Sequence, residues 1–231
     1  MIAPPFPAAG VVFDLDGVLI DSESANVESA RQALATFGVQ IGDASIPLIV
    51  GRHPRDYLPE LLARHRVDGV DPREVARVQE GTWRRLVEQV AAMPGAVALV
   101  RRLAAAGLQL AVATSSGVAS ARSALQRLGV AQAFSALLTI EDVRRAKPDP
   151  EIYRLAARRL GLAPCHLVAV EDSPHGIAAA RAAGLACIAL AGAWTPAEKL
   201  AAAQVVVQHL DQVPGLIRRL PGPLPPGRQK A

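Results

Sequence analysis

Short apolar runs alternate with amphipathic stretches along the second half of the chain. The runs consist mostly of Val, Leu, Ile and Ala, and they predict strands at residues 108–113, 136–139, 167–170, 187–190 and 205–207. Between the runs, apolar residues recur at every third or fourth position, which predicts helices at residues 96–106, 118–128, 150–160 and 177–183. Strands and helices that alternate in this way are typical of a parallel sheet covered on both faces. We therefore predict an α/β fold with a doubly wound parallel sheet.

The N-terminal third of the chain follows a different pattern. An apolar run ends at Asp14, within the stretch VVFDLDGVLIDSE, and predicts one more strand. Helical stretches follow at residues 23–37, 55–65 and 72–90, without a convincing strand between them. We therefore expect residues 22–92 to form an all-helical domain inserted into an α/β core of residues 1–21 and 93–220. Residues 221–231 are rich in Pro and Gly and poor in large apolar side chains, so we expect them to be disordered.

The composition is that of a protein with a substantial core. The chain has 231 residues, of which 51% are hydrophobic but only 3% are aromatic, so the core must consist mainly of Ala, Leu and Val. No apolar run approaches the roughly 20 residues that a membrane-spanning helix needs. The first residues, MIAPPFPAAG, lack the basic and apolar regions of a signal peptide, so we expect a cytoplasmic protein. Cys165 and Cys187 lie in apolar runs, which favours buried free thiols over a disulfide.

The formal net charge of +4 and the pI near 9.6 raise the question of nucleic-acid binding. The basic residues, however, come as scattered doublets with apolar neighbours at helical spacing, such as Arg101–Arg102 and Arg158–Arg159. This pattern indicates solvated helix faces. We therefore expect neither a nucleic acid nor a membrane as a partner.

Polar side chains gather where three of the predicted strands end. Asp14 and Asp16 point to the same side of an extended chain, and two carboxylates about 4 Å apart repel by roughly 4 kcal/mol at an effective dielectric of about 20. The strand at 108–113 ends in Thr114 within TSSG, the strand at 167–170 ends in Glu171, Asp172 and Ser173, and a loop adds Lys147. The carboxyl ends of parallel strands meet at one edge of a sheet. Acids gathered there favour a hard cation such as Mg²⁺, while a hydroxyl, helix-start N–H groups and Lys147 suit a phosphate.

Four segments resemble the motifs of the haloacid dehalogenase superfamily of phosphotransferases. They are DLDGVLIDSE, Thr114 within ATSSG, Lys147 within KPDP, and EDSPHGIAAARAAG, in this order over nearly the whole chain. The chain is similar to the branch with a helical cap inserted after the first motif, near phosphoglycolate phosphatases and β-phosphoglucomutases. The resemblance implies a cap that closes over the substrate to exclude water.

The resemblance also implies a role for each motif residue. Asp14 is expected to be the nucleophile that forms an aspartyl-phosphate, and Asp16 the general acid and base. The phosphate would be bound by Thr114, the backbone of Ser115, and Lys147. Mg²⁺ would be held by Asp14, the backbone carbonyl of Asp16, and Asp172, with Glu171 as a direct ligand or through a water. Gly17 fits a tight turn in which a side chain would crowd the site.

Three functions remain open within this resemblance. Dehalogenases lack the second aspartate of the first motif, so Asp16 favours phosphate chemistry. β-Phosphoglucomutases carry a histidine and an arginine in the cap, where this chain has Asn26 and Pro54. We therefore expect a phosphatase that hydrolyses a small phosphorylated metabolite, such as a sugar phosphate or phosphoglycolate, and that is a monomer or weak dimer. A phosphomutase and a noncatalytic metabolite-binding protein are the alternatives, and the expected substrate contacts are Asn26, Arg52, His53 and Arg55.

Overall fold

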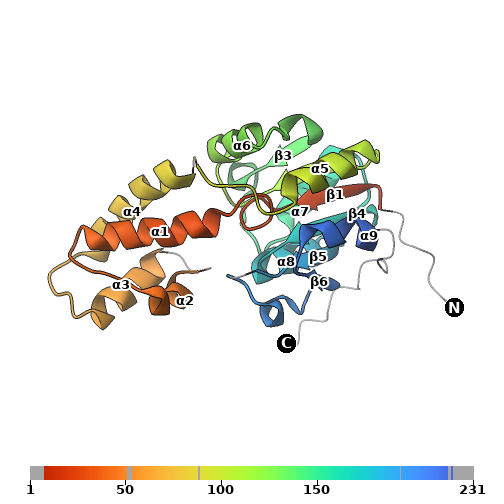
Figure 1. Ribbon diagram of the computed structural model, residues 1–231. Helices are drawn as coiled ribbons and strands as arrows, with labels where there is room; N and C mark the ends of the chain where they lie inside the picture. Colours follow the sequence, from red (N-terminus) through yellow and green to blue (C-terminus); the bar gives the residue numbers. More distant parts are fainter. Residues whose placement is uncertain (1–7, 51–53, 88, 193, 218–219, 221–231) are drawn as a thin grey trace. The chain divides into compact units, whose positions relative to one another are not determined.

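The chain forms two compact units in the computed structural model, which describes residues 8–50, 54–87, 89–192, 194–217 and 220. One unit combines residues 1–20 with residues 92–231, and the other consists of residues 21–91. Figure 1 draws the chain with its helices and strands labelled. The larger unit contains the sheet, and the smaller one is helical.

A six-stranded sheet, in the order β3-β2-β1-β4-β5-β6, forms the centre of the larger unit. Every pair of neighbouring strands is parallel, and β1 lies between β2 and β4 with Phe13 opposite Val112 and Val170. The strands are β1 Gly10–Phe13, β2 Gln109–Ala113, β3 Ala136–Leu138, β4 Leu167–Glu171, β5 Ala186–Leu190 and β6 Val205–Val207. The prediction of a doubly wound parallel α/β fold is confirmed.

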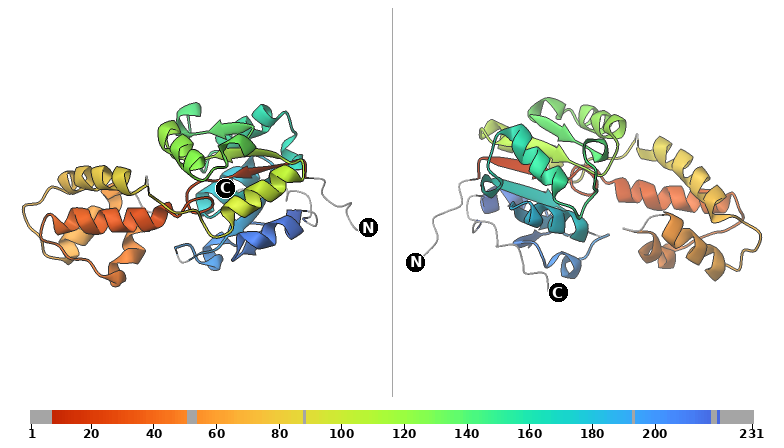
Figure 2. Two further views of the ribbon diagram at one scale, coloured as in Figure 1. Left: turned by 45° about the horizontal axis from the view of Figure 1, so that its top comes forward. Right: turned by 180° about the vertical axis from the view of Figure 1, so that it is seen from behind.

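Helices cover both faces of this sheet, as Figure 2 shows from two sides. The helices α7 and α8 contact each other on one face, and α5 and α9 contact each other on the other. Residues of β1, β4 and β5 are buried throughout, as expected for central strands of a parallel sheet. Small side chains such as Ala179 and Ala180 let α8 pack closely against β4 and β5. The helices of this unit are α5 Ala96–Ala105, α6 Val118–Arg127, α7 Glu151–Leu160, α8 Pro174–Ala182 and α9 Val213–Ile217.

The smaller unit is built from helices, with α1 packed against α4 and α3 also against α4. Its described residues, 21–50, 54–87 and 89–91, contain no strand. The Asp21 side chain caps α1 by accepting a hydrogen bond from the Ser24 N–H. The helices are α1 Ser22–Ala35, α2 Ile46–Ile49, α3 Pro54–Arg64 and α4 Pro72–Val87.

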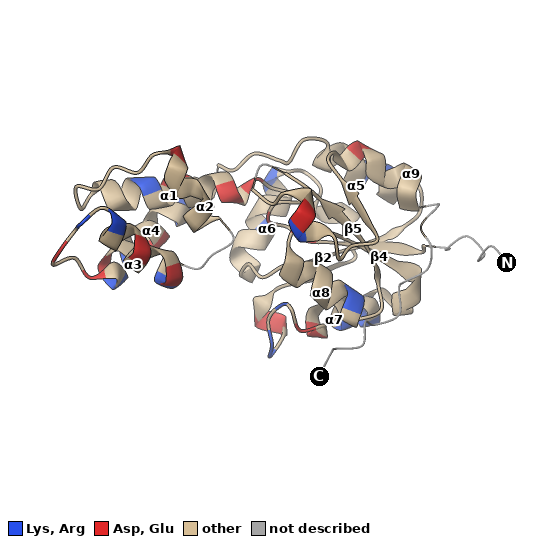
Figure 3. Cartoon of the chain, turned by 90° about the horizontal axis from the view of Figure 1, so that it is seen from below, with Lys and Arg blue, Asp and Glu red and all other residues tan. Residues whose placement is uncertain are grey.

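Positively and negatively charged residues are distributed over the helices of both units (Figure 3). On α3, Arg64 pairs with Glu60 one turn earlier at 2.8 Å, and on α4, Arg84 pairs with Glu80 at 2.5 Å. Such pairs at four-residue spacing are characteristic of exposed helix faces. No helix among the described residues is both long and apolar enough to cross a membrane.

The structure corrects two details of the sequence interpretation. Cys165 is exposed, because it lies in the short 3-10 turn Pro164–His166 ahead of β4, whereas Cys187 is buried in β5 as expected; both are free thiols. The helix predicted at 177–183 starts earlier, at Pro174, because the Ser173 side chain accepts a hydrogen bond from the Gly176 N–H and caps it there. Residues 221–231, expected to be disordered, lie outside the described residues.

Candidate active site

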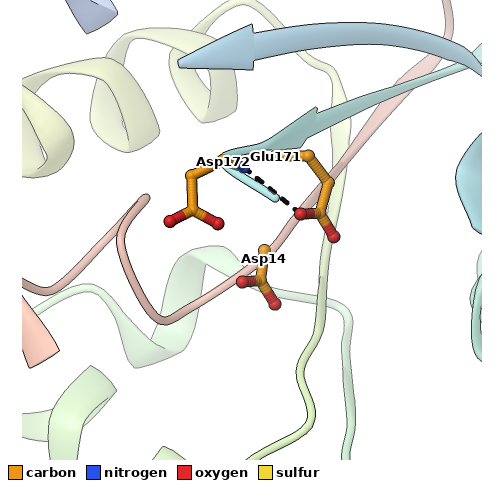
Figure 4. Close-up of side chains that lie close together, drawn as sticks. All are labelled: Asp14, Glu171 and Asp172. Carbon is orange, nitrogen blue, oxygen red and sulfur yellow. Dashed lines mark hydrogen bonds between the residues drawn. The ribbon is translucent and has the colours of Figure 1, made fainter. Parts of the chain in front are cut away.

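Three carboxylates converge where β1 and β4 end. Asp14 directly follows β1, and its N–H donates to the Val170 carbonyl at 2.9 Å, so it continues the pairing with β4. Glu171 is the last residue of β4, and Asp172 is the next residue. One oxygen from each of Asp14, Glu171 and Asp172 lies within 4.8 Å of the others (Figure 4). Adjacent parallel strands thus place acids that are far apart in the sequence at one point.

Lys147 joins the ends of three strands. Its ammonium donates to Asp14 Oδ1 after β1 at 2.8 Å, to the Ala113 carbonyl of β2 at 2.9 Å, and to Glu171 Oε1 of β4 at 2.6 Å. A lysine ammonium has three hydrogens, so all of them are used. Burial opposes the charge of Lys147, but the attraction of the two carboxylates raises its pKa above the ordinary value. Lys147 therefore stays charged.

The Glu171 carboxylate is fully buried and accepts four hydrogen bonds. Oε1 accepts from Lys147 Nζ and from the Tyr153 hydroxyl, the latter at 2.5 Å. Oε2 accepts from the Asp172 N–H at 3.2 Å, the dashed line in Figure 4, and from Ser173 Oγ at 3.1 Å. Burial, reinforced by the negative charge of Glu171, raises the pKa of Tyr153 well above its ordinary value. The phenol therefore remains a donor.

The electrostatics of the cluster favour a cation. Burial raises the pKa of Asp14 from 3.8 to about 7; Lys147 opposes this shift, while Glu171 and Asp16 add to it. Burial, followed by the charges of Asp14 and Glu171, raises the pKa of Asp172 well above its ordinary value. One ammonium therefore does not offset the carboxylates around it. Oxygen ligands this close together fit a hard divalent cation, which would supply the missing positive charge.

Gly17 allows the turn after β1 to approach Asp172. A Cβ atom built on Gly17 would lie 1.9 Å from Asp172 Oδ2, and the φ of Gly17 is +75°, which favours glycine. The expectation that a side chain here would crowd the site agrees with this contact. Any other residue would displace the Asp172 carboxylate from the acidic cluster.

Asp16 lies against the end of β2, where two hydroxyls hold it. Its Oδ2 accepts from Ser116 Oγ at 2.6 Å and from Thr114 Oγ1 at 3.2 Å. Thr114 is buried and also accepts from the Ser116 N–H at 2.9 Å, whereas Ser115 is exposed. The first N–H of α6, from Val118, donates to Glu141 Oε1 at 3.1 Å. That helix-start N–H is thus already paired, whereas Ser115, the predicted backbone contact for a phosphate, is an exposed residue.

The expected substrate contacts belong to the helical unit. Asn26 donates to Glu23 Oε2 at 3.1 Å and accepts from Gln79 Nε2 at 3.2 Å. Gln79 is buried and also contacts the Tyr57 hydroxyl, which the sequence interpretation did not include. Arg55 is exposed in α3, next to Asp56, at 3.5 Å between their charged atoms. Arg52 and His53 lie outside the described residues.

Of four residues next to the predicted site side chains, Tyr153 was missed by the sequence interpretation, and the other three belong to the predicted motifs but were assigned no role in the site. Ser116 contacts Asp16, and Tyr153, Ser173 and Gly176 contact Glu171. Gly176 gave a weak signal, because an isolated glycine in a helix costs stability relative to alanine and so suggests a packing or functional reason. Tyr153 gave no such signal, since its spacing in α7 is that of an ordinary core residue.

Comparison with known proteins agrees with this site. A family model described as haloacid dehalogenase-like hydrolase matches residues 11–190. The chain is 35% identical over 206 residues to validoxylamine A 7'-phosphate phosphatase of Streptomyces hygroscopicus subsp. limoneus, covering 87% of this chain and 94% of that protein. It is 34% identical over 214 residues to hexitol phosphatase A of Escherichia coli, covering 88% and 92%.

A solved structure shares the fold over almost the same length. It is a candidate β-phosphoglucomutase from Thermotoga maritima, with a TM-score of 0.77 and 26% sequence identity. The similarity covers 90% of this chain and 97% of that one. The motif order, the sheet topology and these similarities agree, and the chain belongs to the haloacid dehalogenase-like hydrolase family.

Proposed function

We propose that this phosphoric monoester hydrolase is a Mg²⁺-dependent phosphatase that acts on a small phosphorylated metabolite through an aspartyl-phosphate. The observation that carries the proposal is the placement of Lys147 against Asp14, with Asp172 across the same cluster. Two relatives are named for the phosphates of a validoxylamine and of hexitols. These names favour a substrate with a polyhydroxylated carbon skeleton over phosphoglycolate.

In the first half-reaction, Asp14 attacks the phosphorus atom of the substrate. An oxygen–phosphorus bond forms to Asp14 and the bond to the leaving oxygen breaks, while Asp16 gives that oxygen a proton. Lys147, fully charged, offsets negative charge on the phosphoryl oxygens as it develops. Thr114 and the Ser115 backbone hold the phosphoryl group, and the Thr114 hydroxyl already faces Asp16.

In the second half-reaction, water replaces Asp14 on phosphorus. Asp16, now ionised, accepts a proton from the attacking water, and the carboxylate of Asp14 is regenerated as phosphate leaves. A carboxylate nucleophile thus divides a slow hydrolysis into two easier steps. Asp14, the backbone carbonyl of Asp16, and Asp172 are the proposed ligands of Mg²⁺, with Glu171 as a further candidate. When bound, Mg²⁺ supplies positive charge for the cluster and the transferring phosphoryl group.

A phosphate-release assay tests this proposal. We expect p-nitrophenyl phosphate and at least one of a panel of hexitol phosphates, sugar phosphates and phosphoglycolate to be hydrolysed with Mg²⁺. Because Mg²⁺ would supply positive charge for the carboxylates and the transferring phosphoryl group, a chelator should lower the rate of hydrolysis about 100-fold or more, and excess Mg²⁺ should restore it. Equal rates with and without chelator would refute the metal dependence.

A phosphomutase is the second candidate, favoured by the structural similarity to a candidate β-phosphoglucomutase. It is disfavoured by Asn26, at the position where the mutase branch carries a histidine. With β-glucose 1-phosphate and the corresponding bisphosphate, we expect free phosphate to appear faster than glucose 6-phosphate. The contacts proposed to select the substrate remain Asn26, Arg52, His53 and Arg55.

Stabilisation by Mg²⁺ should depend on pH. The pKa of Asp14 is 3.8 when unperturbed and about 7 in the fold, so between these values the folded chain holds a proton that the unfolded chain has lost. This group therefore favours the folded state at low pH, and its contribution disappears as pH rises through about 7. Mg²⁺ must displace that proton below pH 7, so it should raise the Tm more at about pH 8 than at about pH 5.5.

Thermal denaturation with and without Mg²⁺ at the two pH values measures this effect. The Asp172→Asn variant is the control, because it should lose most of the Mg²⁺-induced shift at both pH values. A larger shift at the lower pH in the wild-type protein would contradict the prediction.

A further inference from the structure

We propose that Tyr153 is a positioning residue of this site: its hydroxyl holds the Glu171 carboxylate so that Glu171 orients Lys147 against Asp14. This inference rests on the proposed function, because the reaction it serves is the phosphoryl transfer to Asp14. Tyr153 lies in α7, outside the residues assigned a role above. Its hydroxyl donates to Glu171, one of the three acids of the cluster.

The hydrogen bonds of Glu171 define its role. A carboxylate offers about four lone-pair positions, and Glu171 accepts from Lys147, Tyr153, Asp172 and Ser173. All of these positions are occupied by groups of the chain, so Glu171 anchors its neighbours, and a direct bond from Glu171 to Mg²⁺ would require one of these hydrogen bonds to break. This assignment separates Glu171 from Asp172, although the two are adjacent and both belong to the acidic cluster.

Lys147 and Tyr153 meet on the same oxygen, Glu171 Oε1. Lys147 donates to it at 2.6 Å and Tyr153 at 2.5 Å, and the Lys147 nitrogen lies 5.2 Å from the centre of the Tyr153 ring. Lys147 comes from a loop, so the strands do not hold its backbone as they hold Asp14. Tyr153, by contrast, is fully buried in α7, which packs against β2. The phenol thus links a rigid helix to the oxygen that orients the lysine.

The start of α8 lies directly against the Glu171 carboxylate. A Cβ atom built on Gly176 would lie 1.9 Å from Glu171 Cδ and 2.0 Å from Oε2. The Gly176 N–H donates to Ser173 Oγ, which itself donates to Glu171. Glu171 is therefore confined between α8 and Tyr153. Without the Tyr153 hydroxyl, Oε1 would keep only Lys147, and the carboxylate could turn about its side chain.

The Tyr153→Phe variant tests the proposal, because it removes the hydroxyl and keeps the ring. We expect kcat to fall about tenfold or more, while KM and the Kd for Mn²⁺ stay within about twofold of the wild-type values. A lower kcat with unchanged KM and Kd would show that the hydroxyl acts on the position of the Lys147 ammonium and not on substrate or cation binding. A parallel rise in KM and in the Kd for Mn²⁺ would overturn the proposal, as would an unchanged kcat.

Thr139→Val is the matched control, because Thr139 is also buried and its hydroxyl also donates to a carboxylate, that of Asp142, at 3.0 Å. This hydroxyl lies outside the proposed machinery, so kcat should not change. A loss of kcat in this control equal to that in Tyr153→Phe would show a general packing effect and overturn the proposal.

The side-chain ammonium signal of Lys147 provides a readout that needs no turnover. The chain has three lysines, Lys147, Lys199 and Lys230, so a nitrogen–proton NMR spectrum of the ammonium groups is simple to assign. A buried ammonium with three acceptors exchanges slowly with water and should give a visible signal in the wild-type protein and in Thr139→Val. In Tyr153→Phe we expect that signal to broaden or disappear.

These two readouts separate the inference from the proposed function. If no substrate is hydrolysed by the wild-type protein, the proposed function fails, while the NMR signal still shows whether Tyr153 positions Lys147. If Asp14→Asn abolishes hydrolysis but Tyr153→Phe changes neither kcat nor the Lys147 signal, the function stands and the inference is wrong.

Discussion

The Asp14→Asn variant should release phosphate at least about 10⁴-fold more slowly than the wild-type enzyme. The amide keeps the size of the side chain but lacks the negative charge with which the carboxylate attacks phosphorus. The measurement is kcat for p-nitrophenyl phosphate with saturating Mg²⁺. In the wild-type protein, rapid quenching and reaction with hydroxylamine should also trap the aspartyl-phosphate, which the variant cannot form.

This variant should remain folded, because burial disfavours the charged form of Asp14 in the absence of a cation. Without Mg²⁺, at about pH 8, its Tm should equal or exceed that of the wild-type protein. Asp142→Asn is the matched control, since Asp142 follows β3 and accepts its hydrogen bonds from Thr139. The control should keep the wild-type kcat, and residual activity of Asp14→Asn above about 1% would count against a nucleophilic Asp14.

The Lys147→Met variant should lose both activity and stability. Methionine can fill much of the same space near the Tyr153 ring, but it leaves the buried Asp14 and Glu171 without the ammonium that they share. Removing one partner of a buried ion pair costs about 3–5 kcal/mol of unfolding free energy. The loss of positive charge beside the transferring phosphoryl group should also lower kcat about 10³-fold.

Urea unfolding at about pH 8, with and without Mg²⁺, measures the stability change. Because a divalent cation can replace part of the missing positive charge, Mg²⁺ should restore more unfolding free energy in Lys147→Met than it adds to the wild-type protein. Lys199→Met is the control: Lys199 is exposed, so its loss should change the unfolding free energy by no more than about 0.5 kcal/mol. If Lys147→Met has the same unfolding free energy as the wild-type protein, the prediction that the buried ion pair stabilises the fold is wrong.

Helices and strands could be predicted from the sequence wherever a pattern of apolar residues extends over enough positions. The strands at 136–139 and 205–207 were predicted to within one residue, because each is a continuous apolar run, although only its last residue in the structure, Leu138 or Val207, is buried. Shorter elements were missed: α2, over Ile46–Ile49, is too short for a helical period to show. The end of α4 was placed at 90 instead of Val87, since helix ends depend on local hydrogen bonds more than on periodicity.

The candidate active site, too, was predicted only in part from the sequence. The sequence by itself determined the fold class, because burial on both faces of a parallel sheet dictates its pattern of apolar runs, and it indicated which acids, hydroxyls and lysine end the strands. Only the tertiary structure decided which groups touch. The hydrogen bonds of Lys147 and Tyr153 to one oxygen of Glu171, and the closeness of Gly17 to Asp172, are contacts between segments far apart along the chain. No local pattern records them, because they depend on how the helices and loops pack against the completed sheet.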